Sequence, residues 1–174
     1  MLNNYKKIST NEIILYNNIL LLSRNKVFYT KLKINDTFQN RINLIFIHVS
    51  FLFIKVKHKN QEKVYKKFFQ SMFDLIFDKV ELNMREIGYG DVTVNKNMKF
   101  LVKTFYNILL NCETYNNKSK NHKIMFLTKY LEQTNITKNS NNDDLLGYFN
   151  KYHSFCLDLS SDSVLSGGFN FNYK

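Results

Sequence analysis

The amino-acid sequence predicts an all-α protein: one domain, residues 1–174, folded as a bundle of about six helices with a central antiparallel helical hairpin. Three observations support this prediction. Apolar residues recur every three to four positions over several long segments, which is the spacing of a buried helix face. The period-two alternation typical of half-buried strands is nowhere sustained. Two of the only 5 Gly in the chain lie in one tight turn within Phe68 to Tyr106, between two long amphipathic patterns.

The first helix is predicted from Ser9-x-x-Glu12, a capping box in which each side chain bonds an amide that the first turn leaves unpaired. This helix would extend to about Arg24 and bury one face composed of Ile13, Tyr16, Ile19, Leu20 and Ser23. A short connecting turn of helix is expected next, at Phe28, Tyr29 and Leu32.

A second helix is expected to follow Asp36-Thr37, which can cap it, and to end at about Lys57. It is apolar around most of its circumference, since residues 44–47 point in four successive directions. A helix of this kind is surrounded by others, so we place it at the centre of the bundle. His48 lies near its middle, where a buried histidine with satisfied hydrogen bonds is favoured over a functional one.

The third and fourth helices form the hairpin. The third runs from about Gln61 to Ile87, and the fourth begins at a cap formed by Asp91 or Thr93. Their connection is so short that the two helices must be antiparallel neighbours. The buried face of the third helix would hold Phe69, Met72, Phe73, Ile76, Val80, Met84 and Ile87, and that of the fourth Val94, Met98, Leu101, Phe105, Ile108 and Cys112.

The turn of the hairpin, residues 85–91, has a structural explanation. Gly88 lies where a helix end favours φ > 0, Gly90 lets the chain reverse, and Asp91 caps the next helix. Arg85 and Glu86 either fix the turn through hydrogen bonds or present charge to a partner, and the residues alone leave both interpretations open.

The C-terminal part is predicted to contain two further helices. A polar loop at residues 116–121 precedes a helix from about Lys123 to Gln133. The most polar stretch, residues 135–144, is expected to be a loop, and a last helix follows from about Asp144 to Leu159. The tail, residues 166–174, begins with Ser-Gly-Gly and is expected to be loose.

The chain is strongly basic, with a net charge of +11 and a pI of about 9.5. Such an excess favours anionic partners, namely nucleic acid, the ribosome surface or anionic lipid head groups. The densest cluster, offset only by Glu62, consists of Lys55, Lys57, Lys59, Lys63, Lys66 and Lys67. An AT-rich genome would also enrich Lys and Asn at neutral positions, so a solvated loop explains this cluster about as well as a footprint for RNA phosphates or lipids.

Neither secretion nor a membrane span is predicted. The apolar run at residues 13–22 is interrupted by Asn17 and Asn18 and lacks a small-residue cleavage site. The most hydrophobic segment, Ile42 to Val56, is shorter than the roughly 20 residues that cross a bilayer. Cys112 and Cys156 lie far apart in apolar patterns, which indicates free thiols in a reducing compartment.

The sequence offers little support for catalysis. Asp74, Asp78 and Glu81 resemble the carboxylates of a metal pair, but none of the four His has a Glu three residues before it, as a di-iron bundle requires. They are interpreted as a solvated stripe that faces Lys96, Lys99 and Lys103 across the hairpin. His153-x-x-Cys156 has no second ligand pair at zinc spacing, and phosphate-binding and nucleophile-elbow motifs are missing. We therefore expect no catalytic residue, metal or cofactor.

Several of these segments together resemble the ubiquinol–cytochrome c chaperone family, the assembly factors of the respiratory cytochrome bc1 complex. The resemblance rests on Arg41-x-x-Leu44-x-x-x-His48, on Phe69 to Met72, on the turn RE-x-G-x-GD at residues 85–91, and on Lys99 to Tyr106. It covers residues 27–115 well and weakens beyond them, although Leu165 to Gly168 followed by Phe-x-Phe is similar to the end of the family's sequences.

The resemblance implies a binding protein and not an enzyme. Its client would be newly made cytochrome b, and candidate motif or client-binding residues are Arg41, His48, Arg85, Glu86, Gly88, Gly90 and Asp91. It also implies that the protein binds a small co-chaperone, is located at the ribosome and contacts an anionic membrane surface, and that it does not bind DNA. The expected location is the cytoplasm of a bacterium, peripheral to the inner membrane, or the mitochondrial matrix. The alternative is a basic helical module that binds RNA or the ribosome.

Overall fold

A computed structural model describes residues 9–57, 62–134 and 140–173 of the chain. Within these ranges the protein is helical and forms no strand, which confirms the all-α class. The helices are α1 (Thr10–Ser23), α2 (Val27–Thr30), α3 (Phe38–Lys57), α4 (Glu62–Glu86), α5 (Asp91–Glu113), the 3-10 turn η1 (Tyr115–Asn117), α6 (Lys120–Tyr130), α7 (Ser140–Asp158) and α8 (Ser161–Leu165). None of these helices is long and apolar enough to cross a membrane.

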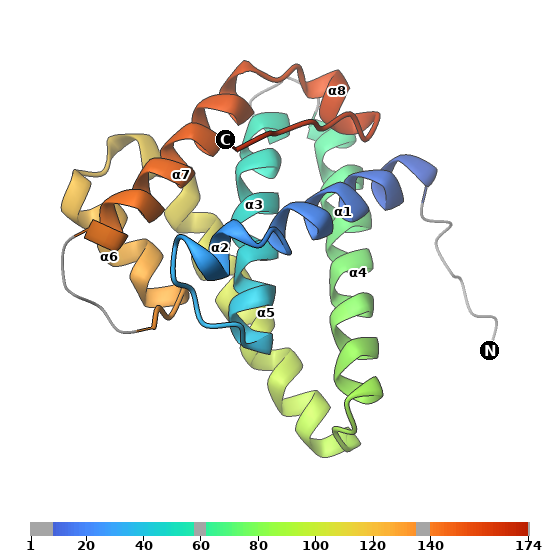
Figure 1. The fold of residues 1–174 in the computed structure, drawn as a ribbon. Helices are drawn as coiled ribbons and strands as arrows, with labels where there is room; N and C mark the ends of the chain where they lie inside the picture. Colours follow the sequence, from blue (N-terminus) through green and yellow to red (C-terminus); the bar gives the residue numbers. More distant parts are fainter. Residues whose placement is uncertain (1–8, 58–61, 135–139, 174) are drawn as a thin grey trace.

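Helix α3 lies at the centre of the bundle, as its all-round apolar surface predicts (Figure 1). It packs against α1, α4, α5, α7 and α8. Leu44, Phe46, Ile47 and Leu52, which point in different directions around the helix, are all inaccessible to solvent. The single-domain core is therefore organised around this one helix.

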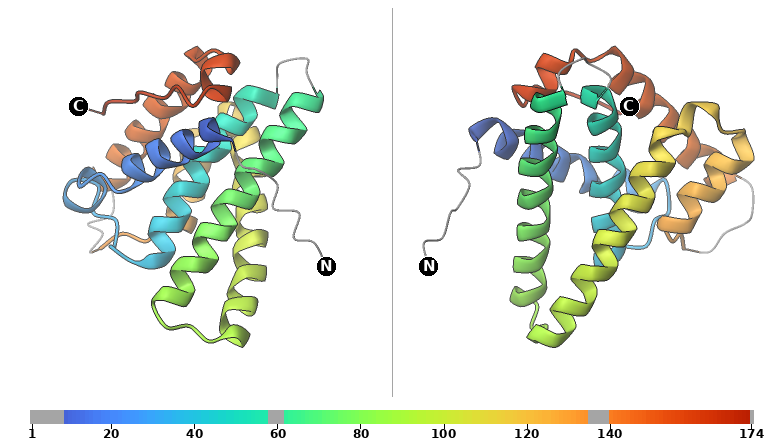
Figure 2. Two further views of the ribbon diagram at one scale, coloured as in Figure 1. Left: turned by 90° about the vertical axis from the view of Figure 1, so that its right-hand side faces the viewer. Right: turned by 180° about the vertical axis from the view of Figure 1, so that it is seen from behind.

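The hairpin of α4 and α5 projects from the rest of the molecule (Figure 2). Its two helices diverge from the turn, and α5 makes the most extensive contact with α3. The expected buried faces are largely confirmed, since Met72, Ile76, Leu101 and Phe105 are all buried. Ile87 is an exception, because α4 ends at Glu86 and leaves it 56% exposed.

The predicted capping box at Ser9 is confirmed, but the buried face of α1 and the N-cap of α5 differ from the expectation. At Ser9, the backbone N–H donates to the Glu12 carboxylate at 3.0 Å, as a capping box requires. The buried face of α1, however, includes Leu15 and Leu22, while Ile13 is exposed. Helix α1 carries apolar residues around its whole circumference, so periodicity did not identify the correct face. At α5 the N-cap is Gly90, and Asp91 is already the first residue of the helix, so the prediction of an Asp91 or Thr93 cap was wrong.

The C-terminal part is more ordered than the sequence suggests. Helix α6 begins three residues earlier than expected, behind an N-cap at Ser119. Residues 140–144 of the expected polar loop belong to α7, and residues 135–139 lie outside the described ranges. The expectation of a loose tail is also corrected, since Phe169, Phe171 and Tyr173 pack against the core.

An aromatic cluster explains why the tail is held. The ring centroid of Phe171 lies 5.1 Å from those of Tyr152 and Phe155, and Tyr173 lies 4.8 Å from Tyr148. Gly167 anchors the same segment to α1, because its carbonyl accepts a hydrogen bond from the Asn18 side chain at 3.3 Å. The alternating aromatic residues of the tail thus cover one face of α7.

Candidate functional site

The turn of the hairpin is held by Arg85. Its Nε and Nη2 donate to Glu81 Oε1 at 3.0 and 2.8 Å, and its Nη1 donates to Asp91 Oδ1. These hydrogen bonds, first to Asp91 and then to Glu81, raise the pKa of the guanidinium. Arg85 and Asp91 therefore tie the end of α4 to the start of α5, which is the local structural role that the sequence left open.

The two glycines of the turn differ in what they require. Gly88 has a φ of +93°, and the N–H of Tyr89 donates to the Met84 carbonyl at 3.0 Å, as in a Schellman motif. A side chain at position 88 would be strained by this backbone conformation. Gly90 has an ordinary φ of −72°, so the expectation that its flexibility reverses the chain is not met. Its carbonyl accepts the first hydrogen bond of α5, from Val94, at 2.9 Å.

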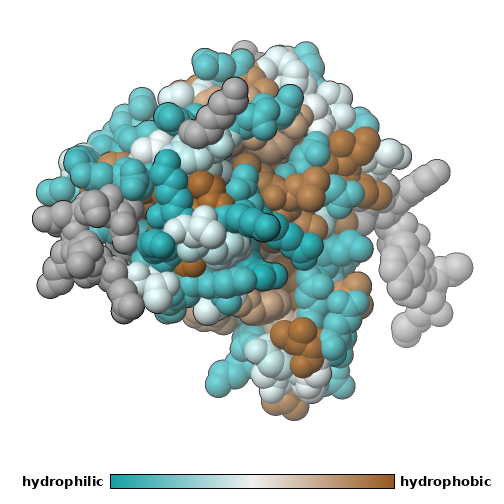
Figure 3. Space-filling view, viewed as in Figure 1, coloured by the Kyte–Doolittle hydropathy of each residue, from teal (hydrophilic) through white to brown (hydrophobic). Residues whose placement is uncertain are grey.

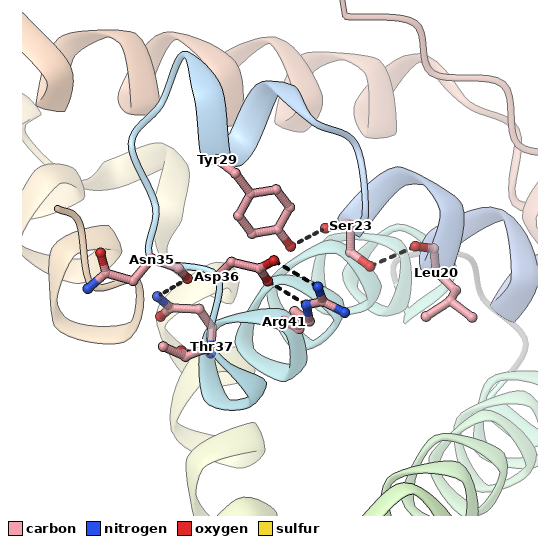
Figure 4. A network of polar contacts seen from close by, with 8 residues as sticks. Leu20, Ser23, Tyr29, Asn35, Asp36, Thr37 and Arg41 are labelled. Carbon is pink, nitrogen blue, oxygen red and sulfur yellow. Dashed lines mark hydrogen bonds and ion pairs between the residues drawn. The ribbon is translucent and has the colours of Figure 1, made fainter.

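Arg41 is held at the start of α3 by a bidentate ion pair with Asp36 (Figure 4). Its Nε lies 2.6 Å from Asp36 Oδ1, and its Nη2 lies 2.8 Å from Asp36 Oδ2. The hydrogen bond from Arg41 lowers the pKa of the Asp36 carboxyl. Nearby, the Tyr29 hydroxyl donates to the Ser23 carbonyl at 3.2 Å and closes the link between α2 and α1. The guanidinium is thus fixed in position at the surface.

A cavity of about 190 Å³ lies between α1, α3 and α4. Its rim carries Arg24, Arg41 and Glu86. Its walls are mainly apolar and include Tyr16, Leu20, Phe38, Ile42, Ile45, Val80 and Ile87. We call it the α1–α3–α4 groove. The fold therefore brings together Arg41 and Glu86, two of the candidate residues, from segments that are distant in the sequence.

The contribution of α1 to this groove was not anticipated from the sequence. Tyr16, Leu20 and Arg24 line it, although the expected motif residues begin only at Arg41. Helix α1 also leaves Ile13, Ile14 and Leu21 exposed on its outer side. Apolar residues on every side are unusual for a helix at the surface. That all-round pattern is the signal that could have identified α1.

His48 has a structural position away from the groove. It is fully buried, its Nδ1 lies 2.6 Å from the Leu44 carbonyl, and its Nε2 lies 2.8 Å from the Tyr148 hydroxyl. Burial lowers its pKa to about 4, so the imidazole is neutral at physiological pH. The Leu44 carbonyl requires the proton to be on Nδ1, and Nε2 then accepts the Tyr148 hydroxyl proton. His48 is the satisfied core histidine that the sequence favoured.

The basic cluster is partly neutralised in the fold. Lys57 pairs with Glu113 at 2.5 Å and Lys66 pairs with Glu62 at 2.5 Å. Lys55 donates to the Leu157 carbonyl, and Lys59 lies outside the described ranges. Of the six lysines, only Lys63 and Lys67 lie within the described ranges with neither an ion pair nor a side-chain hydrogen bond to another described residue. The cluster is therefore less available to an anionic partner than its sequence indicates.

The acidic stripe of the hairpin does not pair with the lysines of α5 as predicted. Asp74 accepts a hydrogen bond from Gln70 at 2.6 Å, and Glu81 accepts from Arg85. Asp78 has its pKa raised by partial burial and by the charges of Asp74 and Glu81. Across the described ranges no ion pair joins these carboxylates to α5, and no group of three or more ligands suits a metal ion. Divergence of the two helices from the turn accounts for the missing cross-hairpin pairs (Figure 2).

Cys112 and Cys156 are both buried free thiols, as predicted. Burial raises the pKa of Cys156 to about 12 and that of Cys112 well above its ordinary value. A thiol acts as a nucleophile only as the thiolate, so neither side chain is suited to that role. Both line a second cavity of about 440 Å³ with His153, whose pKa is lowered by burial. These residues are consistent with packing and supply no activated nucleophile.

Comparisons with known proteins agree with the resemblance seen in the sequence. The profile of a family described as ubiquinol-cytochrome C chaperone matches residues 30–171, well beyond the 27–115 core. The fold is similar to that in a crystal structure of the Cbp3 homolog from Brucella abortus, with a TM-score of 0.78 and 20% identity over 94% of this chain and 89% of that chain. A comparison with curated proteins gave no match. The chain therefore belongs to the ubiquinol–cytochrome c chaperone family, the assembly factors of the cytochrome bc1 complex.

Proposed function

We propose that this protein binds newly made cytochrome b and holds it during assembly of the cytochrome bc1 complex. Family membership supports the assembly role. The observation that carries the choice of site is the α1–α3–α4 groove, whose apolar walls are rimmed by Arg24, Arg41 and Glu86. A chaperone for a membrane protein must cover apolar side chains before they reach the bilayer, and an apolar groove with a charged rim is suited to this task.

The dimensions of the groove limit what it holds. A cavity of about 190 Å³ accommodates a few side chains of a client helix and not the whole helix. Ile87, a wall residue that is 56% exposed, continues the apolar surface beyond the cavity, and Leu21 adds an exposed apolar side chain on α1. The client helix would therefore lie across α1 and the end of α4, with anchoring side chains in the groove. The charged rim would contact polar groups at the end of the apolar segment.

The protein would act by binding, without a chemical step. The described ranges offer a neutral buried histidine and two protonated thiols, none of them suited to catalysis. We further propose a small co-chaperone and a ribosomal station as partners, at the cytoplasmic or matrix side of the membrane that contains the bc1 complex. The basic surface of the chain is consistent with both partners.

The groove can be tested with an exposed substitution that spares the core. Ile87→Asp places a charge at the groove on a side chain that is 56% exposed. Leu157→Asp is the matched control, because Leu157 is 53% exposed and lines the separate cavity near Cys156. We expect Ile87→Asp to reduce the cytochrome b recovered with the tagged protein from cells, and to reduce the amount of assembled bc1 complex. Leu157→Asp should leave both unchanged.

Crosslinking gives a second, independent readout. A photoreactive residue at Leu21 should capture cytochrome b in living cells, whereas one at Met125, also exposed but on α6, should not. Normal cytochrome b recovery by the Ile87→Asp protein, together with no crosslink from Leu21, would rule out this groove. Normal bc1 levels in cells that lack the gene would rule out the assembly role itself.

A further inference from the structure

The outer face of α5 carries a row of three lysines. We define this face by Val92, Lys96, Lys99, Lys103, Tyr106 and Leu110, which follow one another at intervals of 4, 3, 4, 3 and 4 residues. All six side chains are exposed. None of the three lysines forms an ion pair with a described residue, and between Asp91 and Glu113 the helix contains no acidic residue. The acidic residues of the hairpin are confined to α4, the turn and the last residue of α5.

The same face and the adjoining turn expose large apolar side chains. Val92 is 85% exposed at the start of α5, and Phe100 beside the lysines is 58% exposed. Ile87 and Tyr89 are exposed in the turn itself. Figure 3 shows hydrophobic residues gathered at the projecting end of the hairpin. Apolar residues at the tip with lysines just behind them form a surface with two distinct chemical parts.

We propose that the hairpin docks on an anionic phospholipid surface, with the tip residues Tyr89 and Val92 in the interfacial region and Lys96, Lys99 and Lys103 on the head groups. The lysines gain from the negative surface potential, and the apolar side chains gain from leaving water. The projection of the hairpin from the bundle allows this contact without rearrangement of the core (Figure 2).

The aliphatic tip favours a lipid surface over RNA. RNA phosphates would attract the lysines, and RNA bases would stack on an aromatic ring such as Phe100. They offer little to the aliphatic side chain of Val92, which a lipid interface accommodates. Arg85, the one arginine of the turn, already donates hydrogen bonds to Glu81 and Asp91, so it is not free to contact phosphates. The chemistry of the surface as a whole therefore fits a bilayer with anionic head groups.

The test uses the full-length protein and vesicles that contain no other protein, so its result does not depend on the proposed client. Wild-type protein should float with phosphatidylglycerol–phosphatidylcholine vesicles at low salt, and much less with phosphatidylcholine alone. The triple variant K96Q/K99Q/K103Q should bind the anionic vesicles about a hundredfold more weakly, since each lysine near the surface contributes roughly a factor of five. Val92→Ser should weaken binding by a smaller factor and leave its salt dependence unchanged.

The matched control removes the same charge from the opposite end of the hairpin. K63Q/K66Q/K67Q lowers the net charge equally but leaves the outer face of α5 intact, and it should retain most of the vesicle affinity. Thermal unfolding of each variant verifies that these exposed substitutions preserve the fold. Equal losses in the two triple variants would indicate general charge attraction and overturn the proposal. Absence of wild-type binding, or tighter binding of an RNA oligonucleotide through the same three lysines, would also overturn it.

Discussion

Acid is expected to destabilise the protein through His48, and the size of the effect follows from its burial. The folded state keeps His48 neutral, because burial lowers its pKa from 6.5 to about 4. The unfolded chain takes up a proton on this histidine below pH 6.5. The free energy of unfolding therefore falls as the pH falls from 6.5 towards 4, by up to about 1.4 kcal/mol per pH unit and roughly 3 kcal/mol in total.

The assay is urea-induced unfolding at a series of pH values, compared between the wild type and His48→Gln. At neutral pH the variant is expected to have a lower free energy of unfolding than the wild type. As the pH falls from 6.5, its free energy of unfolding should decrease less steeply, by the contribution of about one bound proton. His153 acts in the same direction, since burial also lowers its pKa, so His153→Gln serves as the second arm. Carboxylates whose pKa values are lowered, such as Asp36, change the free energy of unfolding only at lower pH. They therefore do not mask the effect of His48 between about pH 5 and 6.5. Identical slopes in that window for wild type and His48→Gln would refute this reasoning.

Three further predictions concern stability. Gly88→Ala should destabilise the protein by about 1 kcal/mol because of the positive φ, whereas Gly90→Ala should be near neutral, as measured by urea unfolding. Tyr148→Phe should cost about 1–3 kcal/mol by leaving His48 Nε2 without a partner, and lower Tm by several degrees, while Tyr106→Phe at an exposed position should not. Gly167→Ala would bring a Cβ within 2.8 Å of a backbone carbonyl of α1 and should loosen the tail. Limited proteolysis should then cleave the tail faster than in the control Gly147→Ala, where no atom lies within 4 Å of the added Cβ.

Much of the core was predictable because it depends on local periodicity. The buried residues Leu101, Phe105 and Ile108 occupy one stripe of α5, and the α3 sequence is apolar in every direction. Gly88 was predictable for a similar reason, since a helix end that requires φ > 0 selects for glycine. In each case the physical constraint acts within one helix or one turn.

The candidate site was only partly predictable. Arg85 and Asp91 are close in sequence, so their hydrogen bond is a local event. Arg41 and Glu86 meet at the groove only because α3 and α4 pack together and α1 crosses both. The expected pairing of Asp74 and Asp78 with the lysines of α5 failed for the same kind of reason. Sequence spacing gives the buried face of an amphipathic helix such as α5, but not the angle between two helices.

The sequence by itself determined the helical class, the hairpin and the family, since periodicity, the glycine turn and the motif at residues 85–91 are properties of consecutive residues. Only the tertiary structure decided the long-range ion pairs, because Lys57 and Glu113 belong to helices that are distant in the chain. It also decided that the tail packs on α7 and that α1 completes a groove with Arg41 and Glu86. Such contacts depend on how helices are stacked, and the stacking is set by the packing of the whole core.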